Sequence, residues 1–509
     1  MDPLYEYIYI PVVVLCAALL WARSKRAKHY STLPPSPKSD PLIGNLRIMM
    51  NVLDDANTYR NWGLELGSDI ISVTVPGQVI IILNSREAVD ELLFKRSLIY
   101  SDRPQVPMLS SENLTGWGNY TAVLGYGEKW KFHRKLMHET LQKSASEERW
   151  PMIQKESRLA LQRILANPSE FSQELRHMTG STLLMAVYGY EVTSPDDSLF
   201  KTVKIASDGF IQAAVAPINT FPWLEYVPEW FPGASWKAKA NLWRTQKDRM
   251  LHVPYDWTKH KMSTGTEVPS MVSTWIKKYV QQQSTAPVAD LEERIKWIAG
   301  GLFAAGSDTS VSVLRTFIIA MAMHPDVQAK AQAEIDSIIG LRLPELSDQH
   351  SLPYVQCVIK EVIRWRIPAP LALPHSCIQD DTYKGYHIPK GAIVIGNIWA
   401  ISNDSEVYPK PDRFNPDRFL DPSVPEAPVF GFGRRICPGL HHAEAVVTIT
   451  ALGLLAMFNI RPEEDMNGNT VPLKADTTVN EVLRQVLPFK CNISPRSEKH
   501  EQMVREWVG

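Results

Sequence analysis

The sequence FGFGRRICPG at residues 430–439 is the most informative stretch of this 509-residue chain. Its three glycines allow the backbone to approach a flat or bulky group closely. Cys437 follows two arginines, and Pro438 suits the first position of a helix, where its missing N–H costs nothing. The apolar run at 443–457 continues as that helix. A helix N-terminus and neighbouring arginines both lower a thiol pKa, so the pattern predicts a thiolate at Cys437.

Four chemical roles are open to this cysteine, and the sequence fits three of them poorly. A phosphatase nucleophile needs an arginine six positions later, where this chain has Ala443, and no pairing histidine for a protease is indicated. A buried structural thiol is the ordinary reading of a lone cysteine, but it leaves the glycines and arginines unexplained. A haem-iron ligand explains them, because the glycines admit the macrocycle and Arg435 can neutralise a propionate.

The composition argues against several other classes of protein. The five cysteines are widely spaced and form no CxxC pair, which disfavours both a disulfide framework and a zinc site. The formal net charge is −1, so no basic footprint for nucleic acid is indicated. The chain is long enough to bury a large core.

The stretch resembles the haem-binding signature FxxGxRxCxG of the cytochrome P450 family at all five fixed positions. These are Phe430, Gly433, Arg435, Cys437 and Gly439. The resemblance implies a mainly α-helical fold with small β-sheets that holds haem b, with Cys437 as the axial ligand of the iron and the other four residues shaping the cofactor loop.

A second motif, AGSDTS at 305–310, lies inside a long helical pattern at 291–323. Alone it would be read as a helix-packing glycine with capping polar residues. The flanking pattern favours a kinked helix in which the Thr309 hydroxyl bonds back toward the Ala305 carbonyl. The resemblance implies a catalytic pair, with Thr309 beside the bound oxygen and Asp308 relaying protons for O–O cleavage.

Further motifs follow in the order of the family. Glu361 and Arg364 lie one helical turn apart, which alone is usually an exposed ion pair. Arg418, in a segment resembling the family's PERF motif, is expected to join them in a structural network, with Asp417 in place of the commoner Glu. The resemblance also implies that haem propionates are contacted by Trp130, Arg134 and His375.

The first residues predict a membrane anchor. The chain is almost wholly apolar from Leu4 to Ala22, long enough for one span, and four basic residues follow it: Arg23, Lys25, Arg26 and Lys28. A cleaved signal peptide would instead carry its positive charge before the apolar run. We therefore expect an anchor with its basic flank at 1–29, a proline-rich hinge at 30–40 and a haem domain at 41–509. The expected location is the endoplasmic reticulum membrane, with a single span and the catalytic domain in the cytosol.

Periodicity predicts the elements of the body. Two β-branched runs around Pro76-Gly77 predict a hairpin at 69–83, and short strands are expected at 380–395. Apolar residues at helical spacing predict helices at 86–97, 127–142, 150–166, 169–188, 291–323 and 327–339. The aromatic and proline-rich stretch 216–233 fits either a loop at the membrane interface or a packed surface loop.

The resemblance implies a monooxygenase that inserts one oxygen atom of O2 into a lipophilic small molecule. The electron donor is expected to be a separate NADPH-cytochrome P450 reductase, with cytochrome b5 as a further candidate, docking on a basic face at Lys131, Lys135 and Arg434. The chain resembles microsomal fungal members, which serve secondary metabolism, such as terpenoid biosynthesis, or detoxification. Apolar and aromatic stretches near 100–125 and 205–235 are expected to wall the substrate pocket.

Two alternative functions differ in class from the monooxygenase. An O2-independent haem-thiolate isomerase or dehydratase typically lacks the acid–threonine pair, and a non-enzymatic haem sensor needs no proton relay. NADPH-dependent turnover separates both from a monooxygenase.

Overall fold

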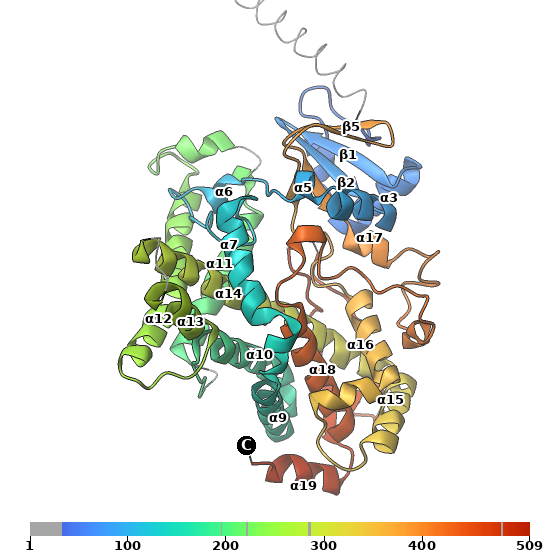
Figure 1. Ribbon diagram of the computed structural model, residues 1–509. Helices are drawn as coiled ribbons and strands as arrows, with labels where there is room; N and C mark the ends of the chain where they lie inside the picture. The colour runs from blue at the N-terminus through green and yellow to red at the C-terminus, as the bar shows by residue number, and fades with distance from the viewer. Residues whose placement is uncertain (1–32, 195, 220–221, 283–286, 480–481, 509) are drawn as a thin grey trace, which may run out of the picture.

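The computed structural model describes residues 33–194, 196–219, 222–282, 287–479 and 482–508. Most of this part is helical, and β1 and β2 lie at one end of the molecule, far from the C-terminal helix α19 (Glu498–Glu506) (Figure 1). The expectation of a mainly helical body with small sheets is confirmed. The predicted anchor at Leu4–Ala22 and its basic flank lie outside the described residues.

The largest sheet brings distant parts of the chain together. Its strand order is β1-β2-β6-β3, with β1 (Ile70–Val75), β2 (Gln78–Leu83), β6 (Ile393–Gly396) and β3 (His375–Ser376). The hairpin is confirmed, because β1 and β2 pair antiparallel with Val75 opposite Gln78, and Gly77 between them has φ 82°. The parallel pairing of β2 with β6 carries His375, opposite Val394, to this end of the body.

Two small two-stranded sheets complete the named strands. The strands expected near residues 380–395 are present as β4 (Asp381–Tyr383), β5 (Tyr386–Ile388) and β6. The other pair is β7 (Phe458–Pro462) with β8 (Cys491–Pro495).

The helical core surrounds one long helix, α14 (Val288–Met323). Its C-terminal half shares a buried apolar cluster with α9 (Trp150–Ala166), α10 (Phe171–Tyr188), α16 (Pro353–Trp365) and α18 (Leu440–Met457). The other helices of nine or more residues are α3 (Asp55–Glu65), α7 (Glu128–Leu141), α11 (Ser198–Ala214), α12 (Ser235–Ser263), α15 (Pro325–Ile338) and α19. Both α14 and α18 are long and apolar enough to cross a membrane, but most of each apolar window is buried inside the described molecule, as expected for core helices.

Short helices connect these elements. The α-helical ones are α2 (Leu46–Met49), α4 (Arg86–Val89), α5 (Ser97–Tyr100), α6 (Pro107–Ser110), α8 (Lys143–Glu147), α13 (Met271–Trp275) and α17 (Ile398–Ser402). The 3-10 turns are η2 (Pro168–Glu170), η3 (Pro217–Asn219), η4 (Pro222–Tyr226), η6 (Leu346–Ser351), η7 (Pro416–Leu420) and η8 (Gly433–Arg435), and the π-helices are η1 (Asp90–Lys95) and η5 (Ile276–Gln281).

Five of the six predicted helices match within a few residues, and the sixth does not. The segment predicted as one helix at 86–97 is divided into α4, the π-helix η1 and the start of α5. Helix α18 begins at Leu440, after Gly439 at its N-cap, so the prediction that Pro438 occupies the first helical position is wrong by two residues. Helix α14 runs without interruption through residues 305–310.

Part of the predicted hinge at 30–40 packs on the body. The backbone N–H of Ser72 in β1 donates to the Pro35 carbonyl at 2.9 Å. The Ser72 hydroxyl donates to the Pro34 carbonyl at 2.7 Å. Residues 34 and 35 of the predicted hinge therefore pack against β1.

Candidate active site

The cysteine loop is closed by its own backbone and packs against η1. The Cys437 N–H donates to the Phe430 carbonyl at 2.8 Å. Gly433 has φ 52°, and a Cβ there would lie 2.1 Å from the Leu93 carbonyl oxygen of η1. The close approach at this glycine is thus to protein backbone. At Gly439 a Cβ would lie 3.9 Å from the Cys437 Sγ, which leaves that side of the sulfur uncrowded.

The environment of the Cys437 thiol differs from the sequence expectation. Burial raises the pKa of the Cys437 thiol, and three weaker influences lower it: the backbone N–H groups of Gly439 and Leu440 and the guanidinium of Arg134. The predicted lowering by Arg434 and Arg435 is wrong, because neither guanidinium is turned to the sulfur. A thiolate here therefore depends on a further positive centre, such as a metal ion, to offset the cost of burial.

Arg435 instead joins the loop to the segment before α7. Its guanidinium donates to the carbonyls of Ser101 at 2.7 Å, Thr121 at 3.3 Å and Leu124 at 2.8 Å. It also lies over the Trp130 ring, 4.5 Å from its centroid. Burial lowers the pKa of Arg435 to about 10.

Trp130 and Arg134 lie on one face of α7, as their spacing predicts. The Arg134 guanidinium lies 5.9 Å from the Trp130 ring centroid. Burial lowers the pKa of Arg134, while the nearby Cys437 raises it. Within the described chain the Arg134 guanidinium has no hydrogen-bond acceptor and no ion-pair partner.

His375 is buried, and one residue near it was missed by the sequence reasoning. The His375 Nδ1 lies 2.7 Å from the Tyr100 carbonyl oxygen. Arg103 donates to the carbonyls of Leu373 at 2.6 Å, Pro374 at 2.7 Å and Ala122 at 2.9 Å. Burial, with Arg435 close by, lowers the pKa of Arg103 well below its usual value. No local motif marks Arg103.

These cations have little compensating negative charge: Asp102 acts to raise the pKa of Arg103 and of Arg435, but burial outweighs it. Across the ranges that the structure describes, no carboxylate forms an ion pair with Arg103, Arg134 or Arg435. Buried charges are normally paired, because an isolated buried ion is costly. An acidic group brought by a ligand would supply the missing charge. The two propionates of a haem fit this donor set, and Cys437 beside Arg134 fits as its iron ligand.

The middle of α14 has an accessible face although the helix is enclosed by other elements. Ala305 is exposed, and Leu302, Gly306 and Thr309 are half-buried, whereas the next residues toward the C-terminus are buried. We call these four residues the accessible face. The Thr309 hydroxyl donates to the Ala305 carbonyl at 3.1 Å, as the sequence predicts.

The Asp308 side chain does not lie on the accessible face. Its carboxylate is buried and forms an ion pair with Arg176 of α10. Successive residues on a helix point about 100° apart, so Asp308 is not on the accessible face that carries Thr309. The two residues of the predicted catalytic pair are adjacent in sequence but are not brought together by this structure.

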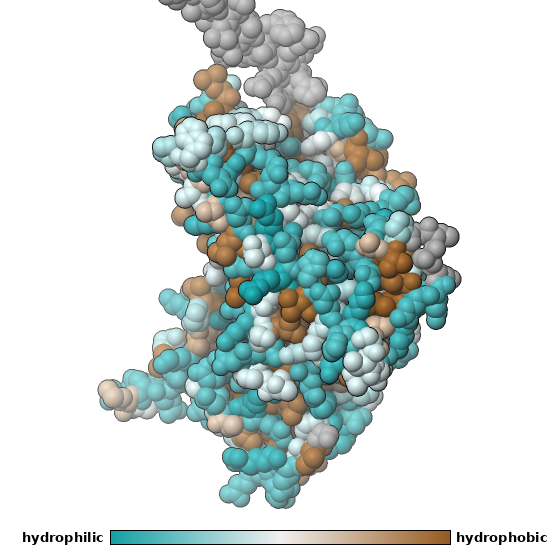
Figure 2. Space-filling model, turned by 90° about the vertical axis from the view of Figure 1, so that its left-hand side faces the viewer, coloured by the Kyte–Doolittle hydropathy of each residue, from teal (hydrophilic) through white to brown (hydrophobic). Residues whose placement is uncertain are grey.

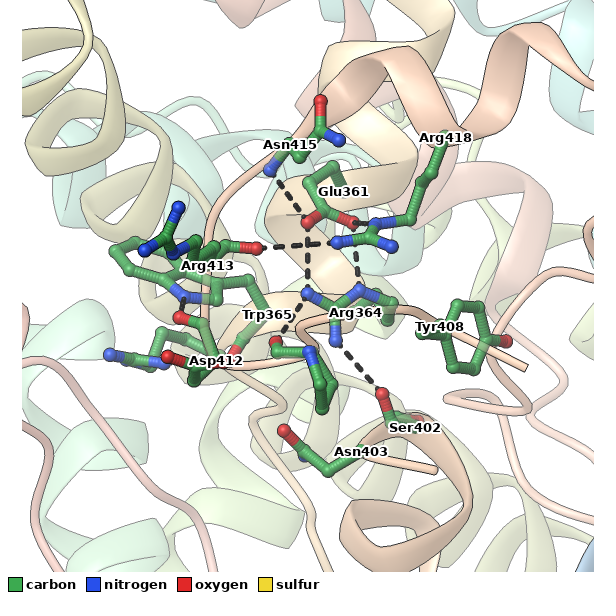
Figure 3. Close-up of polar contacts among 12 residues, drawn as sticks. Glu361, Arg364, Trp365, Ser402, Asn403, Tyr408, Asp412, Arg413, Asn415 and Arg418 are labelled. Atoms are coloured by element: carbon green, nitrogen blue, oxygen red, sulfur yellow. Dashed lines mark hydrogen bonds and ion pairs between the residues drawn. The ribbon is translucent and has the colours of Figure 1, made fainter. Parts of the chain in front are cut away.

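Glu361, Arg364 and Arg418 form one buried network (Figure 3). Arg364 donates to both Glu361 carboxylate oxygens at 2.7 and 2.9 Å, and Arg418 donates to the same carboxylate at 3.1 Å. Arg364 also donates to the carbonyls of Ser402 and Pro411. The network thus ties α16 to the segment 402–418 that leads to the cysteine loop.

The basic residues expected to receive an electron donor are partly engaged. Lys131 pairs with Glu128 at 2.7 Å, and Lys135 lies over the Tyr279 ring. Arg434 is exposed and donates to hydroxyls of Ser97 and Tyr126, both at 3.3 Å.

Comparison with known proteins identifies the family. The model of the family described as Cytochrome P450 matches residues 34–489. A cytochrome P450 monooxygenase of Armillaria gallica is 39% identical, covering 97% of this chain and 98% of the relative. One of Postia placenta is 38% identical over 99% and 98%, and a tryptamine 4-monooxygenase of Psilocybe cyanescens is 35% identical over 96% and 97%. Members of this family use a thiolate-ligated haem b. The chain therefore belongs to the cytochrome P450 family of monooxygenases.

Proposed function

We propose that this enzyme inserts one oxygen atom of O2 into a lipophilic small molecule, with Cys437 as the axial thiolate of its haem. The observation that carries the proposal is the half-buried Cys437 loop beside arginines that form no ion pair in the described chain. A group with a metal ion and two carboxylates satisfies both features at once.

The cofactor roles follow from the positions of the side chains. We assign the propionates to Arg134, whose guanidinium has no acceptor in the described protein, and to Arg435; both guanidinium groups lie over the Trp130 ring. His375 and Arg103 line the same region. Phe430, Gly433 and Gly439 fix the loop that presents the sulfur.

The chain's own groups then control oxygen and protons. When bound, the haem supplies the redox chemistry that activates O2. The Thr309 hydroxyl, bonded to Ala305 within its own helix, can turn to donate a hydrogen bond toward the accessible face. Asp308 can pass protons only after its carboxylate leaves Arg176, which we propose as part of the relay.

The electron supply is proposed to come from a separate NADPH-cytochrome P450 reductase, with cytochrome b5 as a second candidate donor. Arg434, Lys131 and Lys135 offer positive charge on the side of the cysteine loop, which suits an acidic partner.

We further propose an endoplasmic reticulum location, with an N-terminal span at 4–22 and the body in the cytosol. Four large aromatic side chains near residues 216–233 are exposed, which suits contact with the membrane interface: Trp223, Tyr226, Trp230 and Phe231. The face in Figure 2 is mostly polar with small separate apolar areas. A role in secondary metabolism, such as terpenoid biosynthesis, or in detoxification fits a lipophilic substrate, and an indole is a further candidate because one relative is named for tryptamine.

The carbon monoxide spectrum of the reduced protein tests the central assignment. We expect the strongly red-shifted Soret band of thiolate ligation in the wild type. It should be lost in Cys437→Ser and retained in Cys357→Ser, whose cysteine is buried elsewhere. Substrate oxidation should then require O2, NADPH and added reductase. Well-folded, haem-loaded protein without the red-shifted band would contradict the proposal.

A further inference from the structure

The ring of Tyr120 lies directly on Gly301, one turn of α14 before Ala305. A Cβ at Gly301 would lie 2.5 Å from Cε2 and 2.7 Å from Cδ2 of Tyr120, so no side chain fits between them. The Tyr120 hydroxyl also donates to the Gly301 carbonyl oxygen at 3.4 Å. The absence of a side chain at Gly301 therefore leaves the space that the Tyr120 ring fills.

Tyr120 is part of a cluster of aromatic rings from three elements. Its ring centroid lies 5.5 Å from that of Trp117 and 5.3 Å from that of Phe210 on α11, both edge to face. Trp117 also packs against Phe210 and against Trp297 of α14. Edge-to-face packing is favourable beyond the area that it buries, so the cluster forms a stiff wall.

The loop that carries Tyr120 is tied to α12 by a buried cation. Lys247 is 6% exposed, and its ammonium donates to the Gly116 carbonyl at 3.1 Å and lies 5.1 Å from the Trp297 ring centroid. The ammonium also pairs with Asp248 of its own helix at 3.0 Å. Arg244, one turn earlier, donates to the Glu112 carbonyl at 2.9 Å. These contacts fix the loop and therefore keep the Tyr120 ring packed on Gly301.

The wall stands at the edge of the candidate active site. Residues four apart on a helix lie one above the other, so the Tyr120 ring on Gly301 borders Ala305 of the accessible face. Cys437 is near enough to contribute, after burial, to a raised pKa of Tyr120. The ring therefore borders the accessible face.

We infer that Tyr120 is a specificity-determining residue that closes the substrate space at the N-terminal side of the accessible face, with Lys247 as its positioning residue. The inference rests on the proposed haem-thiolate function. A fixed aromatic edge at this place favours flat, uncharged ring systems and excludes bulky, branched molecules from the approach to Thr309.

Azoles of graded size test the wall by binding alone. Their nitrogen binds haem iron and shifts the Soret band, so imidazole, 4-phenylimidazole and the triaryl azole clotrimazole can be titrated into the full-length holoenzyme. For Tyr120→Ala we expect clotrimazole to bind about tenfold more tightly, because apolar surface finds new space, while imidazole affinity stays unchanged. Tyr120→Phe keeps the ring and should keep the wild-type preference.

The Gly301→Ala variant should change clotrimazole affinity in the direction opposite to Tyr120→Ala. The added methyl group displaces the Tyr120 ring, so clotrimazole affinity should fall while imidazole still binds. In the double variant Gly301→Ala/Tyr120→Ala, clotrimazole affinity should return to that of Tyr120→Ala, because the displaced ring is gone. Lys247→Met, which keeps most of the unbranched chain and removes the ammonium, should weaken the discrimination between clotrimazole and imidazole.

An unchanged clotrimazole-to-imidazole ratio in Tyr120→Ala would overturn the inference, as would a Gly301→Ala effect that persists without the Tyr120 ring. In either case the Soret shift itself remains, so the proposed function stands. A protein that shows no shift with any azole contradicts the haem assignment and this inference together.

Discussion

Gly433 shows how one residue controls the cysteine loop. Its positive φ disfavours any side chain, and a Cβ would lie 2.1 Å from the Leu93 carbonyl oxygen, a backbone atom that cannot turn away. We predict that Gly433→Ala displaces the loop, with haem content and the red-shifted carbon monoxide band both strongly reduced. Haem per polypeptide, measured after purification, checks this.

Gly77 provides the matched control for Gly433. It has a similar conformation, with φ 82°, but a Cβ there would meet no atom within 4 Å. Gly77→Ala should therefore cost only the backbone strain, about 1 kcal/mol, and leave haem content normal. Equal haem content in the two variants would refute the argument from the Leu93 contact.

For single residues, the sequence predicts which residues belong to the site better than it predicts the groups that those residues contact. The setting of Cys437 is local, so its ligand role can be inferred from neighbours in the chain. Its electrostatic partner is Arg134 rather than the adjacent Arg435, because backbone carbonyls of the segment before α7 capture the Arg435 guanidinium. Arg103 could not be found, since the carbonyls of Leu373 and Pro374 that it binds lie far along the chain.

Among the elements, α16 depends on a charge network inside the protein. Glu361 and Arg364 are fully buried, and Arg418 is 5% exposed at its side chain, so neither guanidinium can turn to water for compensation. We predict that Glu361→Gln lowers the free energy of unfolding by about 3–5 kcal/mol, because two buried cations lose their shared carboxylate. Denaturant titration of the holoenzyme measures the change.

An exposed pair next to this network gives the comparison. Lys330 and Asp417 pair at 2.7 Å, but both side chains are at least half exposed. Asp417→Asn should change the free energy of unfolding by less than about 1 kcal/mol. A similar loss in both variants would mean that burial is not what makes the Glu361 network matter.

Elements fixed by local signals are the ones that the sequence predicts. The hairpin follows from Pro76-Gly77 between two β-branched runs, and α10 ends where Gly189 adopts φ 70°. The π-helix η1 was not predicted, because its backbone is set against the distant loop at Gly433. Helix α12 was also not predicted; it contains Pro254, a residue that usually interrupts a helix.

Over the whole molecule, burial lowers the pKa of several histidines, among them His133 and His442. His133 on α7 has Thr121 as a partner for Nδ1 at 2.9 Å but no partner for Nε2 within the described chain, and burial lowers its pKa to about 3. His442 on α18 likewise has an unpartnered Nε2, and burial lowers its pKa to about 4. Neither can accept a proton without destabilising the fold.

The sign of the pH dependence follows from these shifts. An unfolded histidine titrates near pH 6.5, so below that pH the unfolded chain takes up protons that the folded chain refuses. The contribution of each residue is complete above pH 6.5 and is lost as the pH falls toward its folded pKa, at up to about 1.4 kcal/mol per pH unit. We predict that His133→Gln, which keeps a hydrogen-bonding group, lowers this slope between pH 6 and 4 by about that amount in denaturant titrations. The exposed His260→Gln should leave the slope unchanged, and an equal slope in all three proteins would show that His133 is protonated in the folded state.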